Sequence, residues 1–142
     1  MGCDIHPVIL VDEYADHSHP LFSPVAIPRR DRYYRWFGIL AGVRSNLTLF
    51  PETLGLRIQD PWRENHPPGC YDFELEKFLS DEHSPHWFSF RRMQEFSRKY
   101  GSKNEFEETR SIFDNWYMTM GFFETMYKVG PDDVICVFDF DS

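Results

Sequence analysis

Asp4 and His6 are separated by one residue near the start of the chain, in a segment that alternates between apolar and polar side chains. The pattern from Cys3 to Val11 predicts a β-strand, in which residues two positions apart point to the same face, so Asp4 and His6 share theirs with Val8 and Leu10. The two side chains would then lie roughly 7 Å apart and could converge on one metal ion. A solvated strand face, or a structural hydrogen bond between the aspartate and the histidine, is the alternative interpretation.

A second pair of histidines, His83 and His86, precedes a segment that reads as a capped helix. Two histidines three apart in a turn can ligate one metal, although surface histidines in a polar loop are equally common. Together with Asp4, His6 and a C-terminal carboxylate such as Asp141, they would form a mixed nitrogen and oxygen site. Such a ligand set suits Zn, Mn or Fe better than Ca or Mg. With an open coordination position, it could activate water for hydrolysis, with Asp4, His6 and His83 as the catalytic residues.

A basic stretch forms the third candidate for chemistry. It comprises Arg29, Arg30, Arg32, Arg35 and Arg44, interleaved with Tyr33, Tyr34 and Trp36. Guanidinium groups suit phosphate and aromatic faces suit nucleotide bases, so this stretch indicates a nucleotide-sized ligand. We expect Arg32 and Arg44 to meet the phosphate, with Tyr33 and Trp87 beside the ligand. The alternative is a helix whose polar face is simply solvated.

The elements that would position these residues can be predicted from local patterns. A short second strand is expected over Leu21–Ile27, and a helix over Arg32–Arg44 with Asp31 as its N-cap, a strand being the runner-up there. Pro7 has no N–H to donate, so it indicates an edge position or a break in the first strand. The segment Asn46–Leu79 is rich in turns and carries at most one short strand, near Leu56–Ile58.

The second half of the chain predicts two more helices and a final strand. Ser89 is a cap for a helix that ends at Gly101, and Asn104 with Glu107 resembles a capping box for a helix to about Lys128. The second of these helices has two apolar stripes. One comprises Phe113, Trp116, Tyr117, Met120, Phe123 and Tyr127, and the other Met118, Phe122 and Met126. Two stripes favour a helix buried in the core over one at a dimer contact.

The final strand, Val134–Phe140, completes the expected fold class. We predict one α+β domain over residues 1–142, with the N- and C-terminal strands in a small mixed or antiparallel sheet packed against about three helices. The chain is 42% hydrophobic and 18% aromatic, which suffices for a real core at this length.

Charge and cysteine content exclude several classes of function. The net charge of −8 makes the protein a poor binder of duplex DNA, because phosphate contacts need clustered Lys and Arg. No stretch approaches the roughly 20 apolar residues that span a bilayer, and no signal peptide is recognisable. Three cysteines without CxxC spacing are typical of free thiols in a reducing compartment, which indicates the cytoplasm.

The opening Met1-Gly2-Cys3-Asp4-Ile5-His6 resembles a group of small hypothetical proteins from phages and bacteria that begin with the same six residues. Looser resemblances are Tyr33–Arg44, Asp81-Glu82-His83-Ser84 followed by Trp87, and the closing Phe140-Asp141. The group often has a second histidine directly after His83-Ser84, where this chain has Pro85. The resemblance implies a phage-associated origin, the host cytoplasm as location, and by analogy a role in conflict with host defence.

Three hypotheses of function arise from these patterns. The first is a protein that binds a metal ion, a small phosphorylated ligand, or both, with metal-assisted phosphoester hydrolysis as the reaction if it is an enzyme. The second is a binder without catalysis, which sequesters a nucleotide signal or inhibits a host defence protein. The third is a homo-oligomer that associates through the methionine-rich stripe of the last helix.

Overall fold

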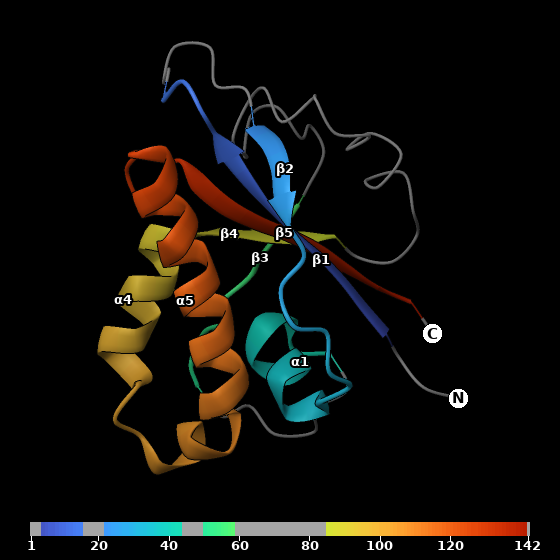
Figure 1. The fold of residues 1–142 in the computed structure, drawn as a ribbon. Coiled ribbons are helices and arrows are strands. Elements are labelled where there is room, and N and C mark those ends of the chain that lie inside the picture. The colour runs from blue at the N-terminus through green and yellow to red at the C-terminus, as the bar shows by residue number, and fades with distance from the viewer. Residues whose placement is uncertain (1–3, 16–21, 44–49, 59–84, 142) are drawn as a thin grey trace.

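The computed structural model describes residues 4–15, 22–43, 50–58 and 85–141, and for Asp141 the backbone alone. They include five strands in one antiparallel sheet with the order β2-β1-β5-β4-β3 (Figure 1). The strands are β1 (Asp4–Asp12), β2 (Phe22–Ala26), β3 (Leu56–Arg57), β4 (His86–Ser89) and β5 (Val134–Asp141). The described helices are α1 (Tyr34–Ala41), α4 (Phe90–Tyr100) and α5 (Arg110–Tyr127), with a 3₁₀ helix, η1 (Asn104–Thr109), before α5. The predicted α+β class, with both terminal strands in the sheet, is confirmed.

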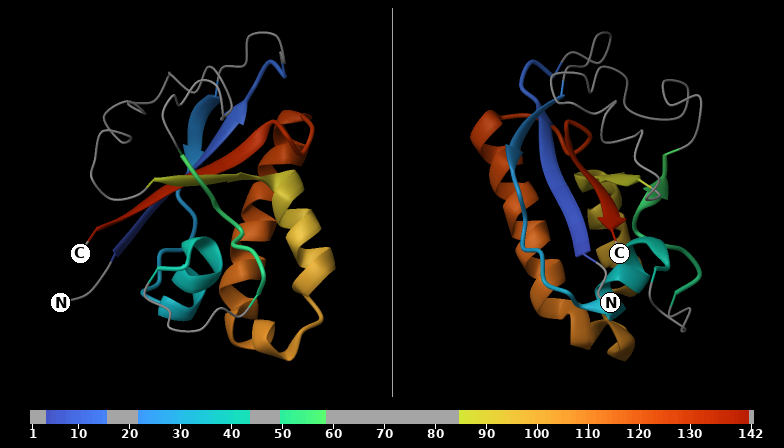
Figure 2. Two further views of the ribbon diagram at one scale, coloured as in Figure 1. Left: turned by 180° about the vertical axis from the view of Figure 1, so that it is seen from behind. Right: turned by 90° about the vertical axis from the view of Figure 1, so that its right-hand side faces the viewer.

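The helices cover one face of the sheet, and the main core lies between them (Figures 1 and 2). Alternate residues of β1 and β5 point into this core, as the strand period predicts. The core residues of the two strands are Ile5, Ile9, Val11, Val134, Cys136, Phe138 and Phe140. Trp36 of α1 and Trp116 of α5 meet edge to face, with ring centroids 5.3 Å apart, and both are fully buried. Buried aromatic side chains therefore join the helices to the sheet.

The opposite face of the sheet is also apolar over part of its area. Val8 and Leu10 of β1 and Ile135 and Val137 of β5 form a second, smaller cluster with Phe22 and Ile58. Leu10, Ile135 and Val137 are fully buried there. On β1 this face carries the polar residues Asp4 and His6 at one end and the buried Asp12 at the other, with Val8 and Leu10 between them.

Local signals place α4 correctly. Its N-cap is Ser89, whose Oγ accepts a hydrogen bond of 3.1 Å from the backbone N–H of Arg92, and the helix ends at Tyr100 before Gly101. Phe90, Met93 and Phe96 are buried on one face of the helix. A capping hydroxyl satisfies one of the otherwise unpaired N–H groups of the first turn, which is why this boundary is legible in the sequence.

The helix α1 is shorter than predicted at both ends. Asp31 does not cap it, because its carboxylate pairs with Arg29 at 2.6 Å and the N-cap position is Tyr33, which makes no side-chain capping bond. The helix ends at Gly42, which adopts the left-handed conformation with φ 70°. This geometry favours glycine, and the last helical residue, Ala41, lies three residues before the predicted end at Arg44.

The last helix differs from its prediction in two ways. Asn104 begins a 3₁₀ segment without a capping box, and the α-helical part begins only at Arg110. Ile112, Phe113, Trp116 and Met120 are buried, so the first predicted stripe faces the core. The second stripe is exposed, at 71% for Met118, 60% for Phe122 and 58% for Met126. Burial of both stripes in the core was therefore wrong.

Gly55 allows β3 and α1 to approach β5 closely. The N–H groups of Leu54 and Gly55 donate to the carbonyls of Ile39 and Leu40, at 2.9 and 2.8 Å, near the end of α1. A Cβ atom at Gly55 would lie 2.6 Å from both the Leu40 carbonyl oxygen and the Phe138 ring, so another residue would force the elements apart. None of the helices in the described residues is long and apolar enough to cross a membrane.

Candidate functional site

The ladder between β1 and β5 brings polar residues from the two ends of the chain together. Asp4 is paired with Asp141, and His6 is paired with Asp139. Residues that are directly opposite in an antiparallel ladder point to the same face. The backbone positions of Asp4, His6 and Asp141 are therefore neighbours in the sheet, as predicted. Asp139, which is 5% exposed, is an addition to that set.

A cavity of about 470 Å³ opens where β2 leaves β1. The two strands pair from Asp12 back to Ile9, with an irregularity between Ile9 and Leu10, and no described strand pairs with this side of β1 before Ile9. Pro7 lies in that stretch, where a residue without an N–H fits, so the predicted edge position is confirmed over this part of β1. The cavity is lined by His6, Pro7, Val8, Pro24, Val25, Ala26, Ile27 and Arg30. Its volume is in the range that small-molecule sites occupy.

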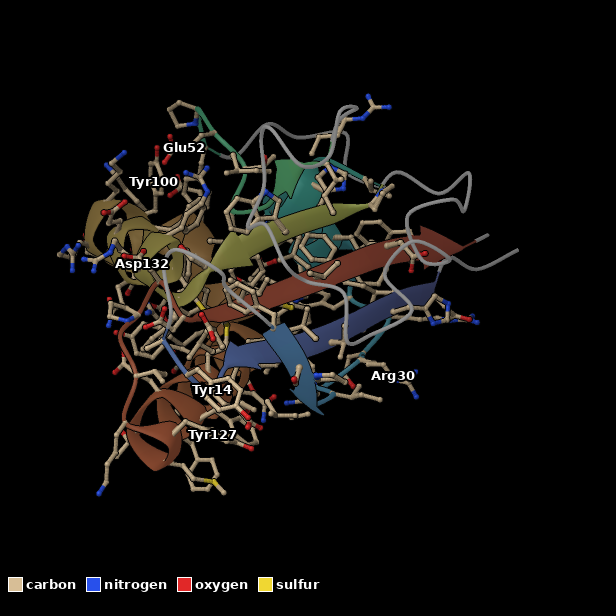
Figure 3. All side chains as sticks on the ribbon, turned by 90° about the horizontal axis from the view of Figure 1, so that it is seen from above. Tyr14, Arg30, Glu52, Tyr100, Tyr127 and Asp132 are labelled. Carbon is tan, nitrogen blue, oxygen red and sulfur yellow. The ribbon has the colours of Figure 1, made fainter. Side chains whose placement is uncertain are left out.

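A smaller polar cavity of about 220 Å³ adjoins the first and shares His6 and Arg30 with it. Its other lining residues are Asp4 and Ile5. Arg30 is exposed, and within the described residues its guanidinium group forms no ion pair and no hydrogen bond. Figure 3 shows Arg30 on the β2 side of β1, at the end of the sheet away from β3. A cation without a partner in the described part of the chain thus stands between the two cavities.

The backbone beside Arg30 is fixed to α5. The N–H of Arg29 donates to Oδ1 of Asn115 at 3.3 Å, and its carbonyl accepts from Nε1 of Trp116 at 2.8 Å. The guanidinium of Arg29 also donates to Oγ of Ser111 at 3.2 Å and pairs with Asp31. Arg29 is therefore held on the helix, and Arg30, the next residue, lines the two cavities.

Arg32, which was predicted to meet a phosphate, pairs with Asp4. Its Nε lies 2.5 Å from Oδ1 of Asp4, and both side chains are about half exposed. The hydrogen bond from Arg32 holds the pKa of Asp4 below its ordinary value, and the charges of Arg32, His6 and Arg30 act in the same direction, whereas desolvation opposes them. The pair keeps a carboxylate at the rim of the polar cavity and occupies Arg32 in doing so.

Tyr33 and Arg35, from the same stretch, are directed to η1. The hydroxyl of Tyr33 donates to Oε2 of Glu108 at 3.5 Å, and Nε of Arg35 lies 2.8 Å from the same oxygen. Partial burial raises the pKa of Tyr33, and the charge of Glu108 adds to this. Neither residue lines the cavities beside Arg30, so the structure does not bring Tyr33 to the predicted ligand position.

His86 and Trp87 lie on opposite faces of β4. His86 is paired with Phe138 on the core face and stacks on its ring with centroids 5.6 Å apart, so it does not meet His6 on the other face. Trp87 is paired with Val137 and packs on the smaller apolar cluster. It shares the face of His6 but is two strands away, roughly 10 Å by strand spacing. It does not line either cavity.

Two predicted site residues, His83 and Arg44, lie outside the described residues, as does the side chain of Asp141. Within the described residues, no group of three or more His, Cys, Asp or Glu side chains could hold a metal ion. The predicted Zn, Mn or Fe site therefore stays a prediction. The observed arrangement is a lone arginine, a histidine and an arginine–aspartate pair around a polar hollow with an apolar cavity beside it.

Comparison with known proteins adds no relative to this arrangement. No family model, no curated protein and no solved structure matches this chain. The cavity and the residues around it therefore carry the functional proposal by themselves.

Sequence reasoning missed the importance of Arg30 and Asp139. Arg30 was one of five basic residues, and what separates it from its neighbours is that Arg29, Arg32 and Arg35 each form an ion pair, with Asp31, Asp4 and Glu108 respectively. Asp139 lies one strand period before Asp141, so strand alternation places the two residues on the same face of β5.

Proposed function

We propose that the protein binds a small phosphorylated ligand, whose anionic head contacts Arg30 and His6 and whose apolar part enters the 470 Å³ cavity. The observation that carries the proposal is the position of Arg30, which joins a polar hollow to an apolar one and has no ionic partner among the described residues. An arginine fork is well suited to phosphate, since it can donate two parallel hydrogen bonds.

The charges near Arg30 favour an anion of modest charge. Arg30 and His6 supply donors, and Arg32 adds a positive charge that Asp4 largely neutralises at 2.5 Å. The whole chain carries a net charge of −8, so a highly charged ligand would meet repulsion away from the hollow. A single phosphate group fits this balance better than a polyphosphate.

The lining of the larger cavity indicates an apolar group on the ligand beyond its phosphate. Besides His6 and Arg30 it consists of prolines, valines, an alanine and an isoleucine. An apolar wall with few polar groups at one end is typical of small-molecule sites, in which the polar groups fix orientation. Tyr33 and Trp87, the predicted stacking residues, lie elsewhere, so recognition through aromatic stacking on a base is not part of the proposal.

Metal-assisted hydrolysis remains a second proposal, and it rests on the register of Asp4, His6, Asp139 and Asp141 at one end of the sheet. Binding through Arg30 needs no metal, whereas hydrolysis at these acids does. Chelation with EDTA distinguishes the two proposals, because it is expected to leave ligand binding through Arg30 unaffected and to abolish hydrolysis. A role against host defence would follow from the resemblance to phage proteins alone.

The binding proposal is tested by isothermal titration calorimetry with phenyl phosphate, inorganic phosphate, benzoate and phenol. Phenyl phosphate is expected to bind at least about tenfold more tightly than inorganic phosphate, because its ring buries apolar surface in the cavity. Tighter binding of benzoate would assign the site to carboxylates. EDTA is expected to leave the affinity for phenyl phosphate unchanged. A loss of affinity in EDTA would show that a metal ion takes part in binding.

A matched pair of variants tests the position of the site. Arg30→Gln is expected to weaken phenyl phosphate binding by roughly tenfold to a hundredfold, the range for a lost charge-assisted hydrogen bond. Arg98→Gln removes another exposed arginine that forms no ion pair within the described residues, on α4 and away from the cavities, and is expected to change nothing. Equal effects of the two variants, or no binding by the wild-type protein, would overturn the proposal.

A further inference from the structure

The exposed stripe of α5 is a contiguous apolar surface on a helix whose other face is in the core. Met118, Phe122 and Met126 are four residues apart, so they lie side by side along the helix. Single exposed apolar residues are normal, but a row of three large ones is typical of an interaction surface. The remaining residues of the same face are uncharged: Ser111, Asn115, Thr119 and Thr125. A helix face that stays in water normally carries charge, so this surface is unusual for a solvated one.

The stripe has an ordered centre. The ring of Phe122 meets that of Phe123 edge to face, with centroids 5.1 Å apart, and Phe123 stacks on Tyr127 at 6.2 Å. Phe123 and Tyr127 in turn pack against the main core. An aromatic side chain that is already held by its neighbours loses little conformational entropy on binding, and such residues commonly dominate interfaces.

The N-terminal end of this face is already occupied within the chain. Ser111 and Asn115 bind Arg29 through hydrogen bonds of 3.2 and 3.3 Å. The open part therefore begins at Met118 and is centred on Phe122, with one methionine a turn away on each side. On this face the residues Met118, Thr119, Phe122, Thr125 and Met126 have the same order in both directions, which suits contact with an identical surface.

Two charges beside the stripe determine which orientation is complementary. Asp114 and Lys128 are both exposed, and neither forms an ion pair or hydrogen bond through its side chain within the described residues. They lie eight residues before and six residues after Phe122, on the same side of the stripe by helical spacing. In an antiparallel pair this side faces the same side of the second copy, which brings Asp114 near Lys128, whereas in a two-fold parallel pair the charged sides lie on opposite edges of the contact and form no ion pair.

We propose that a second copy of this chain covers the stripe, with the two α5 helices antiparallel around a two-fold axis near Phe122. Met118 of each copy then packs on Met126 of the other, and the two Phe122 rings meet at the axis. Asp114 lies within about 3 Å along the helix axis of Lys128 in the second copy, since each residue rises 1.5 Å. A two-fold contact of this kind is self-complementary and forms both ion pairs at once.

The proposal is tested first by the mass of the full chain in sedimentation equilibrium. A mass of twice 17.0 kDa is expected for the wild-type protein, and a monomer at the highest soluble concentration would overturn the proposal. Phe122→Glu places two like charges at the axis, and it is expected to raise the dimer dissociation constant by about thirtyfold or more. Leu56→Glu, at another exposed apolar residue on β3, is expected to leave the dimer intact.

Charge exchange tests the antiparallel orientation independently of hydrophobic contact. Asp114→Lys and Lys128→Asp are each expected to weaken the dimer, because like charges then face one another across the interface. The double variant restores both ion pairs and should recover wild-type dissociation. Lys128 has a left-handed backbone with φ 56°, which aspartate tolerates better than most residues, so the exchange preserves the fold. A double variant as weak as the single ones would contradict the orientation.

Discussion

The indole Nε1 of Trp116 donates a hydrogen bond of 2.8 Å to the backbone carbonyl of Arg29, across 87 positions of sequence. Trp116 is fully buried between the sheet and α1, whereas Arg30 is exposed at the cavities. The contact therefore connects the hydrophobic core with the segment that carries the proposed ligand-binding cation. The backbone of Arg29 is bonded to α5 at both its polar groups, because Asn115 of the same helix accepts a hydrogen bond from its N–H.

The first prediction concerns this connection. Trp116→Phe is expected to lower the free energy of unfolding by about 2 kcal/mol, through the lost hydrogen bond and the smaller ring, and to weaken phenyl phosphate binding. Asn115→Ala removes only an exposed contact and should change stability by less than about 0.5 kcal/mol, yet it too should weaken binding. Urea denaturation and calorimetry measure the two effects. Unchanged affinity in both variants would show that Arg30 does not depend on this anchor.

The second prediction concerns the pKa of Asp4. The hydrogen bond from Arg32 lowers this pKa from 3.8, so Arg32→Gln is expected to raise it, as measured by ¹³C NMR titration of the carboxyl group. A lowered folded-state pKa contributes stability above the unfolded pKa and loses it as pH falls through the folded value. The stability difference between the wild type and the variant should therefore shrink below pH 3.8. Arg91→Gln, which breaks the exposed pair with Asp132, is the control and should leave Asp4 unchanged.

The third prediction separates the two halves of the proposed ligand site. Ile27 is 64% exposed and lines the larger cavity, so Ile27→Ser should leave the fold intact while removing apolar surface from the cavity. Phenyl phosphate binding is expected to weaken by roughly tenfold, and inorganic phosphate binding to stay the same. Leu56→Ser, at an exposed residue outside the cavity, is the matched control. An equal loss for both phosphates would mean that the ring does not enter this cavity.

The fourth prediction concerns the cap of α4. Ser89→Ala removes the hydroxyl that accepts the N–H of Arg92, and it should reduce the free energy of unfolding by about 1 kcal/mol. The exposed Ser102→Ala provides the comparison and should have little effect. Chemical denaturation measures both. A variant at position 89 as stable as the one at position 102 would mean that water replaces the capping bond without cost.

Elements whose signals are local could be predicted from the sequence. Ser89 and Gly101 delimit α4 because a cap and a stop act within one turn. The face of β1 that enters the core was predicted because alternation requires only the strand period, and it holds from Ile5 to Val11. Asp31 reads as a cap by the same local rules, but Arg29, two residues away, takes its carboxylate instead.

The candidate site was less predictable, because it depends on partners distant in the chain. Arg30 and Arg32 are equivalent by sequence, and the difference between them is that Asp4, 28 positions earlier, pairs with Arg32. The cavity arises because β2 leaves β1 after the pair of Ile9 with Ala26, and Pro7 indicates an unpaired edge there but not the cavity beside it. The exposed stripe of α5 was visible as a pattern, but which stripe faces the core is decided by packing.

The cavity is lined by residues 6–8, residues 24–27 and Arg30, whereas most of the aromatic core comes from residues 88–140. The proposed ligand site and most of the aromatic core thus come from separate parts of the chain. Exchanges along the rim formed by Pro24 and Ile27 can alter ligand preference while the packing around Trp116 and Phe138 stays intact. Substitutions at the proposed ligand site can therefore change which ligand binds without changing the core, provided that the hydrogen bond between Trp116 and Arg29 is kept.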